Sequence, residues 1–245
     1  MARTSPPPTL RDLRNKVPSL RQSGTPPALL DRAKKLLAVY LDTAAAQKVA
    51  DADVLRALAD GSAALSIGGI ELDMQAKSPP EPLTRAACRA GCAFCCILTG
   101  RDGGTITRAE AARLHTALAP LKGHPDGRAW HDKACPALDP ETHMCRAYAA
   151  RPMICRSYFS VDAGACEQNA NGHPTPGAAI LGAHQSYLTI HALARALLAG
   201  HAKVPTYSLA TLAAAAVEGQ EATTALRAAR QPPRALDDER KRAAP

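Results

Sequence analysis

Eight cysteines, all between positions 88 and 166, are the residues of this chain best suited to chemistry. They stand at Cys88, Cys92, Cys95, Cys96, Cys135, Cys145, Cys155 and Cys166, the first four in a C-x3-C-x2-C-C spacing. Thiolates are preferred ligands of zinc and of iron–sulfur clusters, and small residues such as Ala90 and Gly91 let neighbouring sulfurs face one point. The sequence therefore predicts a zinc or iron–sulfur site built from most of the eight cysteines.

The number of thiols exceeds the four that one tetrahedral ion takes. Either two sites exist, or one multi-iron cluster takes four sulfurs and the others are structural, redox-active or bound to a second metal. The adjacent pair Cys95 and Cys96 can serve two different metals or leave one sulfur free to react. Disulfides of an exported domain are the alternative, but neighbouring cysteines bridge each other only with strain, which favours metal ligands.

The termini and hydropathy indicate a cytoplasmic protein. The segment 1–8 contains three consecutive prolines and no apolar export signal, and no apolar run is long enough to span a bilayer. Cytoplasmic thiols stay reduced and are free to bind metal. We therefore expect a metal ion or cluster as the partner and no membrane; the sequence identifies no protein partner.

The formal net charge of +8 would suit an acidic partner. However, thiolate ligands carry negative charge that offsets part of this excess. The basic residues are also dispersed, and aromatic residues make up only 3% of the chain, so no aromatic platform for nucleic-acid bases accompanies them. The charge pattern therefore disfavours nucleic-acid binding.

The composition, rich in alanine and leucine, predicts a mainly α fold in which helices wrap a small irregular cysteine-rich domain with a short hairpin. Apolar periodicity predicts helices over 27–48, 52–60, 108–119, 180–200 and 208–229, and weak alternation suggests a strand over 67–74. The hairpin is expected to carry Cys135 and Cys145 on its two arms, facing the same point.

Five segments follow from these patterns. They are a disordered Pro-rich arm at 1–26, an N-terminal helical region at 27–82, the cysteine-cluster metal-binding domain at 83–170, C-terminal helices packing on it at 171–230, and a solvated charged tail at 231–245.

Several motifs in the cysteine region occur in the order typical of one family. The cysteine block is followed by a helix opening at Thr107, by Cys135-Pro136-Ala137-Leu138, and by Cys145-x2-Tyr148-x2-Arg151-Pro152-x2-Cys155-Arg156. This order resembles the CxxCxxCC-type cysteine-cluster family of zinc- or iron-chelating domain proteins, which is bacterial and widespread. Ala137 departs from the bulky apolar residue common there, which implies a locally thinner core.

The resemblance covers about residues 85–166 and implies that all eight cysteines, Cys166 with the least support, are metal ligands. Flagellin lysine N-methylase is a relative of this family, but the flanking helices of this chain lie outside the matched pattern. Methylase activity is therefore not transferred by the resemblance.

Charged and aromatic neighbours of the cysteines have secondary roles. Arg151 and Arg156 bracket Cys155, where a guanidinium lowers the cost of thiolate charge and can donate hydrogen bonds to sulfur; an anionic substrate is an alternative partner for them. His131 and His143 are alternative mixed ligands. In contrast, His184 and His191 are expected to pack inside a late helix with their imidazoles hydrogen-bonded.

Three functions remain open on these grounds. The first is a metal-binding module that its metal helps to fold, because the segment 120–166 is poor in apolar residues. The second is an iron–sulfur-dependent redox or group-transfer enzyme, which would be similar to the methylase relative. The third is an intracellular metal carrier or sensor.

Overall fold

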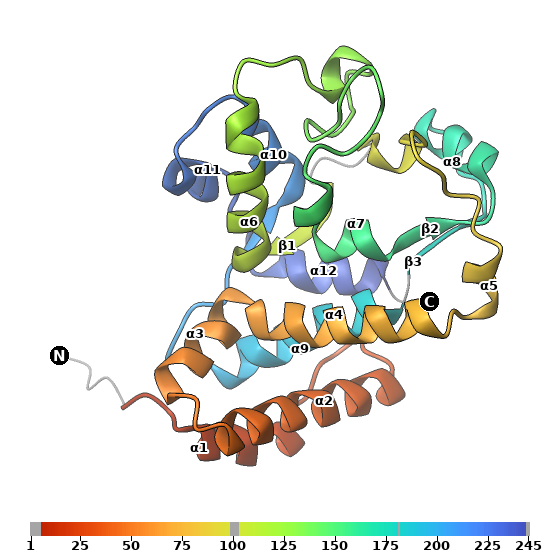
Figure 1. Ribbon diagram of the computed structural model, residues 1–245. Coiled ribbons are helices and arrows are strands. Elements are labelled where there is room, and N and C mark those ends of the chain that lie inside the picture. The colour runs from red at the N-terminus through yellow and green to blue at the C-terminus, as the bar shows by residue number, and fades with distance from the viewer. Residues whose placement is uncertain (1–5, 99–102, 181, 244–245) are drawn as a thin grey trace.

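The computed structural model describes residues 6–98, 103–180 and 182–243, and confirms a mainly helical fold (Figure 1). The first helices are α1 Leu10–Lys16, α2 Pro27–Ala46, α3 Asp51–Asp60, α4 Ser62–Lys77 and α5 Glu81–Thr84. They are followed by α6 Arg108–Leu118, α7 Met153–Ser157, α8 Ala163–Ala170, α9 Gly182–Leu197, α10 Leu209–Val217, α11 Ala222–Ala229 and α12 Arg234–Arg242. Short 3-10 turns lie at Val17–Ser19, Phe94–Cys96, Ala119–Leu121, Gly127–Ala129 and Tyr148–Ala150.

Two small antiparallel sheets join segments that are distant in the sequence. Strand β1 (Thr105–Thr107) pairs with β4 (Thr206–Ser208), with Ile106 opposite Tyr207. Strand β2 (Tyr158–Ser160) pairs with β3 (Ala178–Ile180). The first sheet holds the start of α6 beside the start of α10, and the second holds the end of α7 beside the segment that leads into α9.

The first hydrophobic core lies between the N-terminal helices and α9. In Figure 1 the helices α1 to α4 and α9 form the lower half of the molecule. Leu37 and Leu41 of α2, Leu58 of α3, and Leu188 and Leu193 of α9 are fully buried there. Because α9 is apolar on nearly all sides, it is the central helix of this half.

The second core lies in the upper half of the molecule, where α6 packs between α10 and α11 (Figure 1). Leu114 and Leu118 of α6 and Leu212 of α10 are its largest helical residues, and Cys135 and Leu138 of the cysteine region pack into the same cluster. The cysteine region therefore rests on helices from both sides of it in the sequence. The boundary predicted near residue 171 therefore separates the cysteine region from α10, although both pack in this second core. Helix α9, by contrast, belongs to the first core.

A buried carboxylate connects the two halves. Glu110 of α6 accepts hydrogen bonds from the Thr107 backbone N–H (2.9 Å), from the Met153 N–H at the start of α7 (2.7 Å), and from the Tyr187 hydroxyl of α9. With Thr107 it completes a capping box at the start of this helix. Since α7 carries Cys155, this network also fixes one cysteine-bearing helix to the core.

Both termini differ from the prediction of loose ends. Within the predicted arm, Thr9 caps α1 in a capping box with Asp12, and Leu10 and Leu13 are buried. Within the predicted tail, α12 buries Leu236 completely. In each case a few apolar residues at helical spacing are enough once a partner helix is present, which a composition-based prediction of disorder does not detect.

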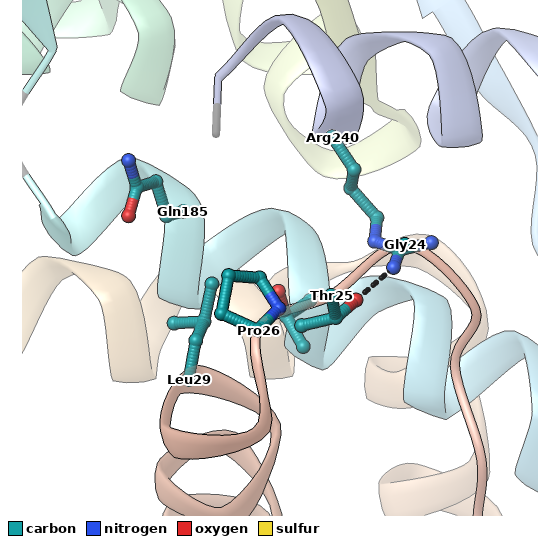
Figure 2. A pocket seen from close by; sticks show the side chains of 7 residues that line it. Gly24, Thr25, Pro26, Leu29, Gln185 and Arg240 are labelled. Atoms are coloured by element: carbon teal, nitrogen blue, oxygen red, sulfur yellow. Dashed lines mark hydrogen bonds between the residues drawn. The ribbon is translucent and has the colours of Figure 1, made fainter. Parts of the chain in front are cut away.

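The two ends also contact each other. Figure 2 shows Arg240 extending from α12 to the loop before α2, where its guanidinium bonds to the Thr25 hydroxyl. The same group donates to the Ser23 carbonyl (3.2 Å) and the Gln22 side chain (3.3 Å), and pairs with Asp237 (3.0 Å). The cavity between these segments has a volume of only about 10 Å³. It is therefore a small packing defect in a structural contact.

Two further predicted elements are corrected. Residues 67–74 are helical and belong to α4, and the segment 208–229 is broken into α10 and α11 at Gly219, which has φ +78°. The weak alternation around Gly68 and Gly69 favoured a strand, but Ala64, Gly68 and Leu72 face the core at i, i+4 spacing. Packing against α9 therefore overrides the low helix propensity of the glycine pair.

Alanine substitutions at this glycine pair are expected to have opposite effects. A Cβ at Gly68 would lie 2.9 Å from the Tyr187 Cβ, so we expect Gly68→Ala to destabilise the protein by about 1–3 kcal/mol through overpacking. Gly69 has open space, so Gly69→Ala should stabilise the helix by up to about 1 kcal/mol. Urea unfolding of both variants tests this pair. Equal effects would contradict the close packing of α4 on α9.

No helix among the described residues has both the length and the apolar content needed to cross a lipid bilayer.

Candidate metal centre

The eight cysteines lie on four separate pieces of backbone. Cys88 and Cys92 lie in the loop after α5, and Cys95 and Cys96 in the 3-10 turn that follows it. Cys135 and Cys145 flank a tight turn, while Cys155 and Cys166 are carried by α7 and α8. The fold brings these pieces together at the end of the molecule opposite the N-terminal helices (Figure 1).

A cavity of about 460 Å³ lies where these pieces meet, and seven of the eight cysteines line it. Cys166 is buried and is not part of this lining. The lining also has an apolar wall, formed by residues that include Leu114 of α6, Ile154 of α7 and Leu209 of α10. Arg89, His143, Tyr148, Arg151 and Tyr158 supply further polar groups to the lining.

Three cysteines form an outer group beside α8. Burial raises the pKa of the Cys92 thiol, and the thiols of Cys95, Cys166 and Cys88 raise it further, because their negative charges would repel one another. Burial also raises the pKa of Tyr158 to about 12, with added contributions from Cys166, Cys95 and Cys88. These mutual effects place Cys88, Cys92 and Cys166 around Tyr158.

The backbone holds the exposed member of this outer group in place. The Cys88 sulfur accepts a hydrogen bond from the Ser160 N–H of β2 at 3.3 Å, and the Ala87 N–H donates to the Ser160 carbonyl at 2.8 Å. The loop is therefore attached to the strand that separates Cys155 from Cys166.

The other four cysteines form an inner group. Burial raises the pKa of Cys135 to about 12, with further increases from Cys145 and Cys95. The pKa of Cys155 is also raised, by burial first and then by the same neighbours and Cys135. The hydrogen bond shared with Cys95 raises the pKa of the Cys96 thiol, and repulsion from Cys135 and Cys155 raises it further. The inner group is thus Cys96, Cys135, Cys145 and Cys155.

Cys95 lies between the two groups. Its sulfur is 4.0 Å from the Cys96 sulfur, and this hydrogen bond, together with the charge of Arg151, lowers the pKa of Cys95 to about 7. It influences the pKa values of Cys92 in the outer group and of Cys135 in the inner one. Adjacent cysteines in the sequence therefore face two different sets of sulfurs.

The predicted hairpin is present as a tight turn with one bridge, between Leu138 and Cys145. Asp139 closes it, since its side chain accepts from the Thr142 N–H at 2.8 Å. The Cys135 N–H donates to the Cys96 carbonyl at 2.8 Å, which joins the turn to the first cysteine block. A Cβ at Gly127 would lie 2.4 Å from the Cys135 carbonyl oxygen, so only glycine fits beneath this contact.

The two arginines predicted to lie beside the cluster differ in their surroundings. The Arg151 guanidinium stacks over the Tyr148 ring, 3.6 Å from its centroid. Burial raises the pKa of the Cys145 thiol, and the positive charge of Arg151 opposes this increase. Arg156 follows Cys155 on α7, but its side chain forms no hydrogen bond or ion pair within the described ranges. A role for Arg156 beside the sulfurs stays a prediction.

The histidines separate into two kinds. His143 lines the cavity with its ring 4.2 Å from the Trp130 ring, whereas His131 accepts a hydrogen bond from the Lys133 N–H and lies outside the lining. His184 and His191 are buried in α9 as expected, but among the described residues neither ring has a hydrogen-bond partner, so that part of the prediction is wrong. The Glu239 carboxylate lies 3.9 Å from Nε2 of His184, beyond hydrogen-bond distance.

The sulfurs lie around one cavity but do not meet at a single point. Within residues 6–98, 103–180 and 182–243, no three Cys, His, Asp or Glu side chains are close enough to hold an ion where they stand. The donor chemistry nevertheless fits a soft metal, because the lining is rich in thiols and contains no carboxylate among the described residues. A metal that binds here has to draw the loop-borne sulfurs together.

The apolar wall is the part of the site that sequence patterns did not indicate. Leu114 appeared only as one member of a helix stripe, and Leu209 follows Cys166 by a long stretch that carries no motif. Only the β1–β4 pairing, which is a tertiary contact, brings Leu209 to the cavity.

Comparison with known proteins identifies the cysteine region alone. Residues 87–174 match a family model named CxxCxxCC, with the description "Putative zinc- or iron-chelating domain". This range contains all eight cysteines. No curated protein and no solved structure matches the chain.

Proposed function

Residues 87–174 of this chain belong to the CxxCxxCC family, and on that premise we propose that the protein binds zinc or iron–sulfur through two adjacent sets of four cysteines. The inner set is Cys96, Cys135, Cys145 and Cys155. The outer set is Cys88, Cys92 and Cys166 with Cys95 as the fourth ligand. The observation that carries this division is that the four inner cysteines pack in one apolar cluster with α6 and α10, to which none of the other four belongs among the described residues.

Two sets of four match the chemistry of the metals. A structural zinc site or a cubane iron–sulfur cluster takes four thiolates, and eight cysteines supply two such sites with none left over. A divalent ion or cluster bound to each set replaces thiol protons with a cation, and so removes the repulsion that now raises the thiol pKa values. Bound metal supplies crosslinks between loop segments that otherwise share few apolar contacts.

The protein's own groups hold the inner set from three sides. Glu110 fixes the start of α7 and therefore Cys155, the Cys96 carbonyl fixes Cys135, and the turn closed by Asp139 positions Cys145. Arg151 offsets charge at Cys95 and Cys145, the sulfurs nearest the mouth. Hydrogen bonds thus hold the segments that carry three of the four inner ligands, and metal has to draw their sulfurs together.

Metal analysis after purification without oxygen is the direct test. We expect two zinc ions per chain in colourless protein, or iron with acid-labile sulfide and the broad visible absorbance of sulfur-ligated iron. Titration with cobalt(II) distinguishes the geometry, because tetrahedral thiolate sites give intense absorption at two equivalents per chain. Protein that is purified without metal and takes up neither zinc nor iron would rule out the proposal.

A further inference from the structure

The cavity beside the sulfurs is lined by apolar and cationic side chains as well as by thiols. Its volume, about 460 Å³, lies within the range of about 300–1,000 Å³ typical of small-molecule sites. Four-sulfur metal sites need no apolar groups, yet Leu114, Ile154 and Leu209 are part of the lining. These residues come from α6, α7 and α10, so three rigid elements shape it.

Two cationic side chains in the lining lack a carboxylate partner. Arg89 and Arg151 both line the cavity, and neither forms an ion pair with an acidic side chain in the described part of the chain. The Arg151 side chain is held by stacking on Tyr148 and by a 3.3 Å hydrogen bond from its Nε to the Tyr148 carbonyl. This leaves the two terminal nitrogens of a positioned guanidinium available at the cavity.

We propose that this cavity binds a small amphipathic carboxylate, with the carboxylate on Arg151 and the apolar body against Leu114, Ile154 and Leu209. The inference rests on the proposed metal sites, because their sulfurs form the other wall. A planar guanidinium pairs with a carboxylate through two parallel hydrogen bonds, which a point charge such as lysine does not reproduce. An apolar chain next to the head group then covers the exposed part of Ile154 and packs beside Leu114 and Leu209, which are already buried.

Hexanoate and its neutral isostere hexanamide are suitable probes, used with metal-loaded protein whose metal content has been measured first. Ligand-observed NMR titration should show hexanoate binding, with hexanamide at least about tenfold weaker because it cannot form the charged pair. Ile154→Ala should weaken hexanoate several-fold without changing metal content, through the lost apolar contact.

Arginine variants separate ligand binding from metal binding. Arg151→Lys keeps the positive charge beside Cys95 and Cys145 but cannot form two parallel hydrogen bonds, so it should weaken hexanoate several-fold while metal content stays at the wild-type value. Arg11→Lys, the same change at an exposed arginine of α1, should leave hexanoate binding unchanged. The proposal is overturned if metal-loaded protein binds neither probe or both equally, or if Arg151→Lys binds hexanoate as tightly as the wild type. Absence of metal in the wild-type protein would instead overturn the proposed function.

Discussion

Cys135→Ser protein is expected to retain one of its two metal sites and to be less stable than the wild type by several kcal/mol. Serine is a poor ligand for soft metals, so the inner set loses its metal. The free energy of metal binding to a structural site, about 10–16 kcal/mol for zinc fingers, is also folding free energy. Metal analysis and urea unfolding of the anaerobically purified variant measure both effects.

Cys88→Ser is the matched variant in the outer set. Cys88 is exposed and is held by backbone bonds to Ser160, so we expect loss of the other metal with a smaller fall in stability. In the double variant the two losses should add, because the sites are separate. If each single variant loses all of its metal, the eight cysteines form one centre; if both keep all of it, the assignment of these ligands fails.

Acidification from pH 6.5 to pH 4 is expected to destabilise the protein by about 3 kcal/mol through His191 alone. Burial, and then the charge of Arg195, lowers the pKa of His191 to about 4 from an ordinary value of 6.5. Between these two values the unfolded chain binds a proton that the folded chain does not. Stability is therefore complete above pH 6.5 and decreases as the pH falls through this window.

His191→Leu tests this contribution, because leucine fills the site without a titrating group. The difference in unfolding free energy between wild type and variant should shrink as the pH falls, and the slope for the variant should be shallower. Acid also releases metal from thiolates, but it does so in both proteins, so the difference isolates His191. His201→Leu, at an exposed position, should leave the wild-type slope intact. Parallel pH profiles for wild type and His191→Leu would contradict the buried neutral imidazole.

Local signals were enough to predict much of this structure. Pro27 and the leucines after it indicated α2, and Thr107 with Glu110 indicated the capped start of α6; both begin where expected. The cysteine spacing indicated the chelating region that the family match confirms. These features depend on residues within a few positions of one another, which is the range over which sequence patterns are informative.

Features that depend on distant contacts could not be predicted. The helical state of Gly68 depends on Tyr187, and the order of the terminal segments depends on Arg240 reaching Thr25. The division of the sulfurs into two sets depends on how far α8 brings Cys166 toward Cys88. Nothing in the spacing of the cysteines encodes that distance, because it is set by the β2–β3 pairing.

The position of Leu209 in the cavity wall has a consequence for how the protein is made. During synthesis all eight cysteines leave the ribosome before Leu209 and α10 do, so the sulfurs are complete while the apolar wall is still missing. Because domains fold from the N-terminus as they emerge, metal has an open route to the sulfurs at that stage. Closure of β4 on β1 then seats the wall. The proposed metal sites are therefore most open to metal before β4 pairs with β1.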